Sequence, residues 1–189
     1  MKVAKDIDKL NFEAVRAAMN GVEAVLEEFP QAGSFLKEFD LNKDGIMNVS
    51  KGYSKINFNI EYFSNENKLI SALTAALQKN YYHKNMNALG AGAHEMGHIV
   101  GRWLFEKSNS TKELDVIAFV EKIIKEAYIS FLRRGKFKRL AQLRKELSGN
   151  ALKNYSECLA DAISDYIING NEASVLSLEI WQIIKEELN

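Results

Sequence analysis

The sequence predicts an α+β protein that is mostly helical and contains one small antiparallel sheet. Pro30 is the only proline in 189 residues, so few positions forbid a helix. Apolar residues recur mostly three and four positions apart, which is the spacing of one helix face. The segment 56–63 (INFNIEYF) instead alternates its side chains in the way of a half-buried strand. Together these observations predict helices around a single short sheet.

The N-terminal part of the chain is expected to hold two helices and then a hairpin. Its elements are, in order, a helix over about 8–28 that breaks near Pro30, a short helix through Phe39, a turn over 40–45, and strands at 46–49 and 56–63. The turn DLNKDG also has the opening spacing of an EF-hand calcium loop. Lys51 stands at its twelfth position, where such a loop needs a glutamate, and a tight turn is therefore preferred.

The rest of the chain is predicted to be helical. The helices are expected at about 66–80, 91–107, 112–134, 136–147, 154–168 and 173–188, with an aromatic loop before the second of them. No repeat or long linker interrupts the sequence, so a single domain over 1–189 is expected. Its three parts are a helical segment at 1–44, a part at 45–110 with the strand and a histidine helix, and a helical part at 111–189.

Composition limits the partners and the location of the protein. The 25 Lys and Arg residues balance the 25 Asp and Glu residues, so no net charge attracts nucleic acid or an anionic membrane. The basic run 133–145 is taken as one solvated face of a helix. Cys158 is the only cysteine, which excludes an intrachain disulfide. No signal peptide or membrane span is visible. We expect a cytoplasmic protein without nucleic acid or membrane partners; its oligomeric state stays open.

Two of the three histidines form an HExxH motif. His94 and His98 are four residues apart, so on a helix both imidazoles project from the same face and can bind one metal ion. Glu95 lies beside them, where it can reach water without binding the metal. This is the division of roles in zinc peptidases. The motif also occurs by chance, so histidines on the surface or at the edge of the core are the alternative.

Catalytic zinc usually has three protein ligands, so a further ligand is needed. Leu104 occupies the position of the third histidine in the metzincin pattern, which excludes that arrangement. Glu157 and Asp161 are again four residues apart on a predicted helix, and they match the gluzincin arrangement of a zinc-binding Glu and an Asp that orients a histidine. His83 and a solvated acidic helix face are the alternatives. The sequence thus predicts zinc bound by residues of two separate helices.

Glycines interrupt the histidine helix at positions 92, 97 and 101. Each costs a helix about 1 kcal/mol relative to alanine. A helix that must admit the backbone of a neighbour at close range could use them.

Three segments carry a family resemblance: INFNIEYFSNENKLISAL, GAGAHEMGHIV and LSGNALKNYSECLADAISDYIINGNEASVLSLEIWQII. They resemble the gluzincin-like metallopeptidase domains of phage minor-head and mobile-element proteins, over residues 45–189. The resemblance implies a zincin-like fold, zinc bound by His94, His98 and Glu157, and Glu95 as the general base. It also implies that the strand at 56–63 is an edge strand against which a peptide substrate pairs. The chain could then be part of a longer phage or exported protein.

One feature of the family pattern is missing. The family often has a tyrosine in an S-x-Y-A element, and Asn150 stands at that position here. The group that stabilises the oxyanion is therefore unassigned, with Tyr155 and His83 as the leading candidates and Tyr81 and Tyr82 beside them. The expected function is zinc-dependent peptide hydrolysis. The alternative is a structural or interaction protein that retains a zincin site, intact or degenerate, without catalysis.

Overall fold

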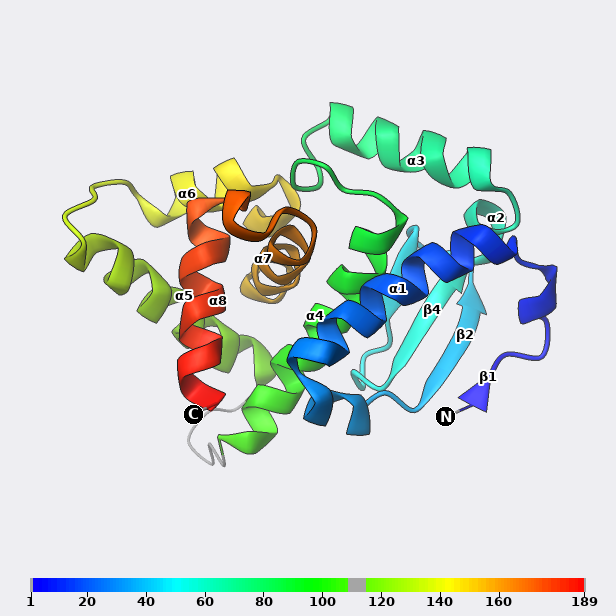
Figure 1. Cartoon of the computed structure of the whole chain (residues 1–189), viewed down its shortest axis with the longest axis horizontal. Helices are drawn as coiled ribbons and strands as arrows, with labels where there is room; N and C mark the ends of the chain where they lie inside the picture. The colour runs from blue at the N-terminus through cyan, green and yellow to red at the C-terminus, as the bar shows by residue number, and fades with distance from the viewer. Residues whose placement is uncertain (1, 109–114, 189) are drawn as a thin grey trace.

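The structure, a computed structural model, combines many helices with a small sheet and describes residues 2–108 and 115–188 (Figure 1). The strands are β1 (Lys2–Val3), β2 (Glu38–Asn42), β3 (Met47–Val49) and β4 (Lys55–Asn59). The α-helices are α1 (Phe12–Glu28), α2 (Ile60–Phe63), α3 (Glu66–Gln78), α4 (Ala88–Lys107), α5 (Val116–Arg133), α6 (Leu140–Leu147), α7 (Tyr155–Asn169) and α8 (Val175–Leu188). Short 3-10 turns lie at Ile7–Lys9, Pro30–Ser34, Asn150–Leu152 and Gly170–Glu172. The mostly helical α+β class is confirmed.

The sheet is mixed, and the prediction of an antiparallel sheet is wrong. Its strand order is β1-β2-β4-β3, and only β3 and β4 are antiparallel. These two strands form the expected hairpin, with Met47 opposite Phe58 and Val49 opposite Ile56. The parallel pairing of β1 with β2 arises because α1 connects them, and a crossover of this kind lets the second strand run in the direction of the first.

Strand β2 replaces the predicted end of a short helix and much of the predicted turn, so the segment 1–44 is not wholly helical. Its Asp40 carboxylate accepts a hydrogen bond from Lys55 Nζ on β4 at 2.7 Å. Its Phe39 ring lies 5.9 Å, centroid to centroid, from the ring of Phe58 on the same neighbour. Contacts with a strand remote in sequence thus decide the conformation of this five-residue segment. With Asp40 in a strand, no EF-hand loop forms here.

Strand β4 ends earlier than the alternating pattern predicts. The Asn59 side chain accepts a hydrogen bond from the backbone N–H of Glu61 at 2.9 Å and so caps α2. Its amide also donates to the carbonyl of Gly45 at 2.6 Å. Residues 60–63 therefore turn into a short helix. In addition, β4 lies between β2 and β3, so it is not an edge strand; β3 is.

The later helices begin and end close to their predicted positions. Asparagine side chains fix several of the N-termini, because their oxygens accept the otherwise unpaired N–H groups of the first turn. The first helix has such a cap too: Asn11 caps α1, which therefore begins at Phe12, later than the predicted start near Asp8. Asn87 caps α4 through the N–H of Gly90 at 3.0 Å. Residues 112–114, predicted as the start of a helix, lie outside the described residues.

Helix α4 lies between the two halves of the molecule. It packs against α1 and β3 on one side and against α7 and α5 on the other, and α5 to α8 gather at the side away from the sheet (Figure 1). The buried apolar side chains of the described residues form one connected cluster from Leu10 to Ile184. In the described part of the chain, we find no helix whose length and apolar character would let it cross a membrane.

Two glycines let neighbouring backbones approach α4 closely. A Cβ atom at Gly92 would lie 1.8 Å from the carbonyl oxygen of Ala18 on α1. A Cβ atom at Gly97 would lie 2.9 Å from the Cα of Ala160 on α7. At Gly101 the nearest atom is the flexible end of the Leu159 side chain, at 3.0 Å. The first two positions are thus contacts with neighbouring backbone, which explains glycines that weaken an isolated helix.

We expect Gly92→Ala to destabilise the protein by about 2 kcal/mol or more, since the added methyl group must push α1 away from α4. Gly101→Ala, in the same helix, should change the free energy of unfolding by less than about 1 kcal/mol, because better helix propensity offsets a mild contact. Urea unfolding of the two variants measures the difference. Equal stabilities would contradict this account of the α1–α4 contact.

Candidate metal centre

Helices α4 and α7 bring His94, His98 and Glu157 together. The Nε2 atoms of His94 and His98 lie 3.2 Å and 3.8 Å from Oε2 of Glu157. One nitrogen or oxygen ligand atom from each of the three residues lies within 4.8 Å of the others. The three residues that the sequence predicts as zinc ligands therefore form a group that could hold a metal ion.

The contact between Gly97 and Ala160 lies in the middle of this group. Gly97 is between the two histidines along α4, and Ala160 is between Glu157 and Asp161 along α7. Asn154 caps α7 by accepting a hydrogen bond from the N–H of Glu157 at 2.8 Å. Glu157 thus lies in the first turn of its helix, where the helix dipole favours a carboxylate.

Each histidine has a partner for its second ring nitrogen. His94 Nδ1 lies 2.8 Å from Oδ1 of Asp161, whose side chain is fully buried. His98 Nδ1 lies 2.9 Å from Oγ of Ser156. Both rings therefore direct Nε2 toward Glu157, as metal-binding histidines with an oriented second nitrogen do. Asp161 stands where the sequence predicts it; Ser156 was missed, because no spacing rule marks a serine beside the ligand.

The donor set suits a transition metal. Two imidazole nitrogens and one carboxylate oxygen are ligands that zinc accepts, and three protein ligands leave one position for water. Calcium and magnesium prefer oxygen ligands throughout. Among the described residues, this is the group of histidine, cysteine and acidic side chains whose ligand atoms converge in this way.

Burial and mutual charge set the protonation of the group without a metal. Burial, reinforced by the positive charge of His94, lowers the pKa of His98 to about 4. Burial also acts to lower the pKa of His94, but the Asp161 and Glu157 carboxylates overcome it and hold that pKa well above 6.5. Burial would raise the pKa of Glu157, yet the hydrogen bond and charge of His94 hold it at about 2. His94 and Glu157 therefore form an ion pair near neutral pH.

Glu95 lies beside the ligands and is only 6% exposed. Burial raises the pKa of its carboxyl group to about 7, against the opposing charge of His94 and a hydrogen bond from the backbone of Val49 on β3. The carboxyl group is thus partly ionised near neutral pH, which suits a group that accepts and returns a proton.

The candidate ligands and Glu95 line a cleft of about 310 Å³. The edge strand β3 and the residues around it line part of the cleft, and aromatic and polar side chains line the rest. The other lining residues include Tyr53, Tyr81, Tyr82, Ile117, Asn150, Asn154 and Ser156. An edge strand and a candidate metal group therefore share one opening.

The four candidates for oxyanion stabilisation lie in different places. Tyr81 and Tyr82 line the cleft, and the ring of Tyr82 is 6.1 Å from that of His94. Burial and the nearby Glu95 carboxyl group raise the pKa of Tyr82, so its hydroxyl stays protonated. Tyr155 does not line the cleft; the Arg144 guanidinium lies over its ring at 4.5 Å.

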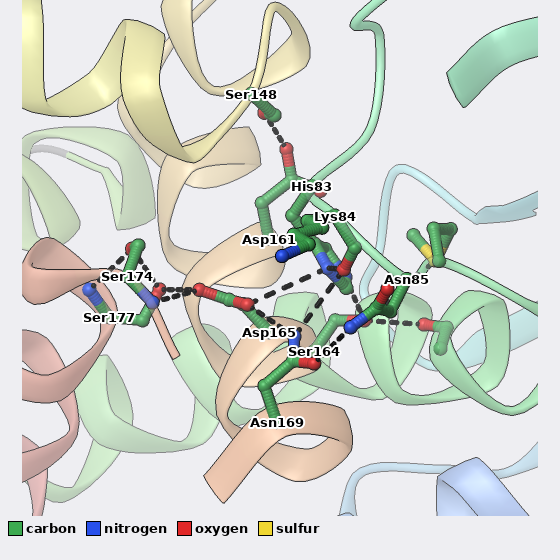
Figure 2. Close-up of polar contacts among 12 residues, drawn as sticks. His83, Lys84, Asn85, Ser148, Asp161, Ser164, Asp165, Asn169, Ser174 and Ser177 are labelled. Atoms are coloured by element: carbon green, nitrogen blue, oxygen red, sulfur yellow. Dashed lines mark hydrogen bonds and ion pairs between the residues drawn. The ribbon is translucent and has the colours of Figure 1, made fainter. Parts of the chain in front are cut away.

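His83 belongs to a separate buried network on α7 (Figure 2). Its Nε2 lies 2.8 Å from Oγ of Ser164, its Nδ1 lies 2.9 Å from the carbonyl of Lys84, and Asp165 is 3.7 Å away. These are the residue types of a hydrolytic Ser-His-Asp triad. Ser164 donates to the carbonyl of Gly90 at 2.8 Å, and each of the three side chains is at most 5% exposed. The network is therefore buried away from solvent, and its hydrogen bonds link the 83–85 loop to α4 and α7.

Comparison with known proteins adds no relative to this geometry. No family model, curated protein or solved structure matches the chain.

We expect the imidazole of His98 to titrate near pH 4 in the metal-free protein, and that of His94 well above 6.5, because burial disfavours a charge on the first while carboxylates stabilise it on the second. Imidazole NMR signals, assigned with His83→Gln and His98→Gln, measure both values. Between pH 6.5 and 4 the unfolded chain protonates His98 more readily than the folded protein does, so the stability present above pH 6.5 is lost as the pH falls toward 4. The stability of the wild type should therefore fall more steeply over this window than that of His98→Gln. Titration of His98 near 6.5 would be the contrary result.

Proposed function

We propose that this protein is a zinc-dependent metallopeptidase of the gluzincin-like, phage or mobile-element associated kind that its motifs resemble. The observation that carries the proposal is the convergence of His94, His98 and Glu157 from two helices, with Glu95 beside them in a cleft bordered by an edge strand. In this proposal the three residues hold zinc, and Asp161 and Ser156 orient the two imidazoles.

The chemistry divides between the metal and the side chains. Zinc in such a site supplies Lewis acidity, which acidifies water and polarises a peptide carbonyl. Glu95 accepts the proton of the attacking water and delivers it to the nitrogen of the leaving amine. Its buried carboxyl group has a pKa of about 7 without the metal, and a bound cation lowers that pKa, so the group that accepts the proton is ionised near neutral pH. Tyr82 contributes a protonated hydroxyl from the wall of the cleft, which suits a hydrogen bond to the developing oxyanion.

Strand β3 is the element that would hold the peptide. The strand at 56–63 was expected to serve as the edge, but β4 is covered by β3 on that side. The backbone N–H of Val49 is directed at Glu95. Backbone N–H and C=O groups alternate in direction along a strand, so those of Met47 point to the same side of β3 as those of Val49. An extended substrate added along this edge would pass directly in front of the catalytic base.

We expect Glu95→Gln to retain zinc and to lower peptide hydrolysis by about 100-fold or more, because the amide cannot accept the proton. Glu157→Ala should lose zinc, since one of three ligands is gone. Digestion of a broad peptide library, followed by mass spectrometry with and without chelator, measures turnover, and metal analysis measures zinc. Glu106→Gln, an exposed change on the same helix, is the matched control.

Two results would contradict the proposal in different ways. If Glu157→Ala bound zinc as tightly as the wild type, the ligand set would be wrong. If the zinc-loaded wild type cleaved none of the library, the alternative of a non-catalytic structural or interaction protein with a retained site would replace the enzyme.

We also expect zinc binding at neutral pH to release about one proton, chiefly from His94. The raised pKa of His94 means that a proton occupies the ring until the metal displaces it. Zinc affinity should therefore rise with pH. Calorimetric titrations in two buffers of different ionisation enthalpy count the protons. Asp161→Asn removes the charge that most strongly raises this pKa and should reduce the count, whereas an unchanged count in that variant would contradict the assignment.

A further inference from the structure

The segment between α6 and α7 contacts both carboxylates of the candidate centre. The Ser148 hydroxyl donates a hydrogen bond to Oδ2 of Asp161, the carboxylate that holds His94 (Figure 2). Two residues later, the Asn150 amide donates to Oε2 of Glu157 at 2.6 Å. Ser148 is fully buried and Asn150 is 2% exposed, so both donor side chains are largely withdrawn from water. Residues 148–150 thus hydrogen-bond both to the proposed ligand Glu157 and to the Asp161 carboxylate that contacts His94.

Backbone hydrogen bonds hold this segment in place. The N–H groups of Gly149 and Asn150 donate to the carbonyls of Asn80 and Tyr81 at 2.7 Å and 2.8 Å. A Cβ atom at Gly149 would lie 2.7 Å from the same Asn80 oxygen, so the close approach requires glycine. The N–H of Ala151 also donates to Oγ of Ser148 at 2.8 Å. The Ser148 hydroxyl therefore accepts one hydrogen bond through its oxygen and donates another to Asp161.

The Asn150 amide has one bonded end and one unbonded end. Its Oδ1 atom is buried and has no hydrogen-bond partner. An unpaired buried acceptor costs free energy, which a position serving packing alone would avoid with an apolar side chain. The side chain is therefore better explained by the bond that its other end makes to Glu157.

We propose that the segment 148–151, the SGNA bracket, is a positioning element that fixes the two α7 carboxylates and thereby sets the metal affinity of the site. This inference rests on the proposed zinc site and goes beyond it. A free glutamate side chain must lose rotamer freedom when it binds a metal, whereas Glu157 is already held by Asn150. Asp161, held by Ser148, keeps the His94 ring in the orientation that binding requires. Removing partners of this kind typically weakens metal binding by about 10- to 100-fold.

The same helix supplies a matched control. Asp165 lies one turn beyond Asp161 and accepts a hydrogen bond from the fully buried Ser177 hydroxyl at 2.7 Å (Figure 2). Ser177→Ala and Ser148→Ala therefore each remove a buried serine bonded to a buried aspartate of α7. Only the Ser148 bond leads to a proposed metal ligand, so the pair separates an effect on the site from a general loss of stability.

The test is a zinc titration of the purified full chain against a competing chelator, with Ser148→Ala, Asn150→Ala, Ser177→Ala and the wild type. Absorption spectra of the cobalt-loaded proteins report the ligand geometry, and thermal unfolding of the metal-free proteins reports stability. We expect the first two variants to bind zinc about 10- to 100-fold more weakly and to show altered cobalt bands. Ser177→Ala should lose stability but keep both the wild-type affinity and the wild-type spectrum.

The outcomes are distinguishable. Wild-type zinc affinity and cobalt spectra in both Ser148→Ala and Asn150→Ala would overturn the bracket and leave the proposed function standing. An equal loss of affinity in Ser177→Ala would also overturn it, since general stability would then explain the effect. Should Ser148→Ala fail to fold, Asn150→Ala decides alone, because Asn150 lines the cleft and its truncation leaves the Asp161 bond intact. Absence of zinc binding in the wild type would instead refute the proposed zinc site itself.

Discussion

The close contact between α4 and α7 at Gly97 and Ala160 is the constraint on which the candidate centre depends. The ligand atoms come from these two helices, and metal–ligand bonds of about 2 Å tolerate little displacement. A side chain at position 97 would meet the Ala160 backbone, so the helices could not come so close. On another face of α4, Gly92 lies against the backbone of Ala18 on α1. The histidine helix is thus held between two backbones, which fixes the position of its side chains along the cleft.

Burying several ionisable groups is the second constraint, because each must find partners inside the protein. Glu157, Asp161 and Asp165 follow one another at four-residue intervals and form a column of carboxylates along one face of α7. Each is held by donors from other parts of the chain: Asn150, Ser148 and Ser177. The polar interior of α7 therefore ties together segments far apart in sequence. Glu157 lines the cleft, whereas Asp165 belongs to the buried network around His83 (Figure 2).

Local spacing was enough to predict most of the helices and to place His94 with His98, and Glu157 with Asp161, on one helix face each, because a four-residue interval has a fixed meaning on a helix. The grouping of Glu157 with the two histidines was predicted from the gluzincin pattern, since spacing within a helix says nothing of how two helices meet. Local spacing was not enough for β2, whose five residues form a strand through pairing with β4. The alternation at 56–63 gave no sign that the Asn59 cap would end the strand. Ser148 and Ser156 also escaped prediction, since their importance comes from tertiary contacts. The position of His83 could not be predicted either: it is buried and does not line the cleft, and nothing about a single histidine in a loop indicates burial.

The environment of Glu95 links its protonation to the charge on the neighbouring residues. Burial raises its pKa most, the charge of His94 opposes this, and the Val49 N–H favours the ionised form further. A divalent cation held by the three candidate ligands would replace the single charge of His94 with a larger one, and so lower the pKa of Glu95 below about 7. The base would then be ionised to a greater extent at neutral pH with the metal bound than without it. An exposed glutamate would be ionised in both states, so the burial that raises the energy of this carboxylate is also what makes it responsive to the metal.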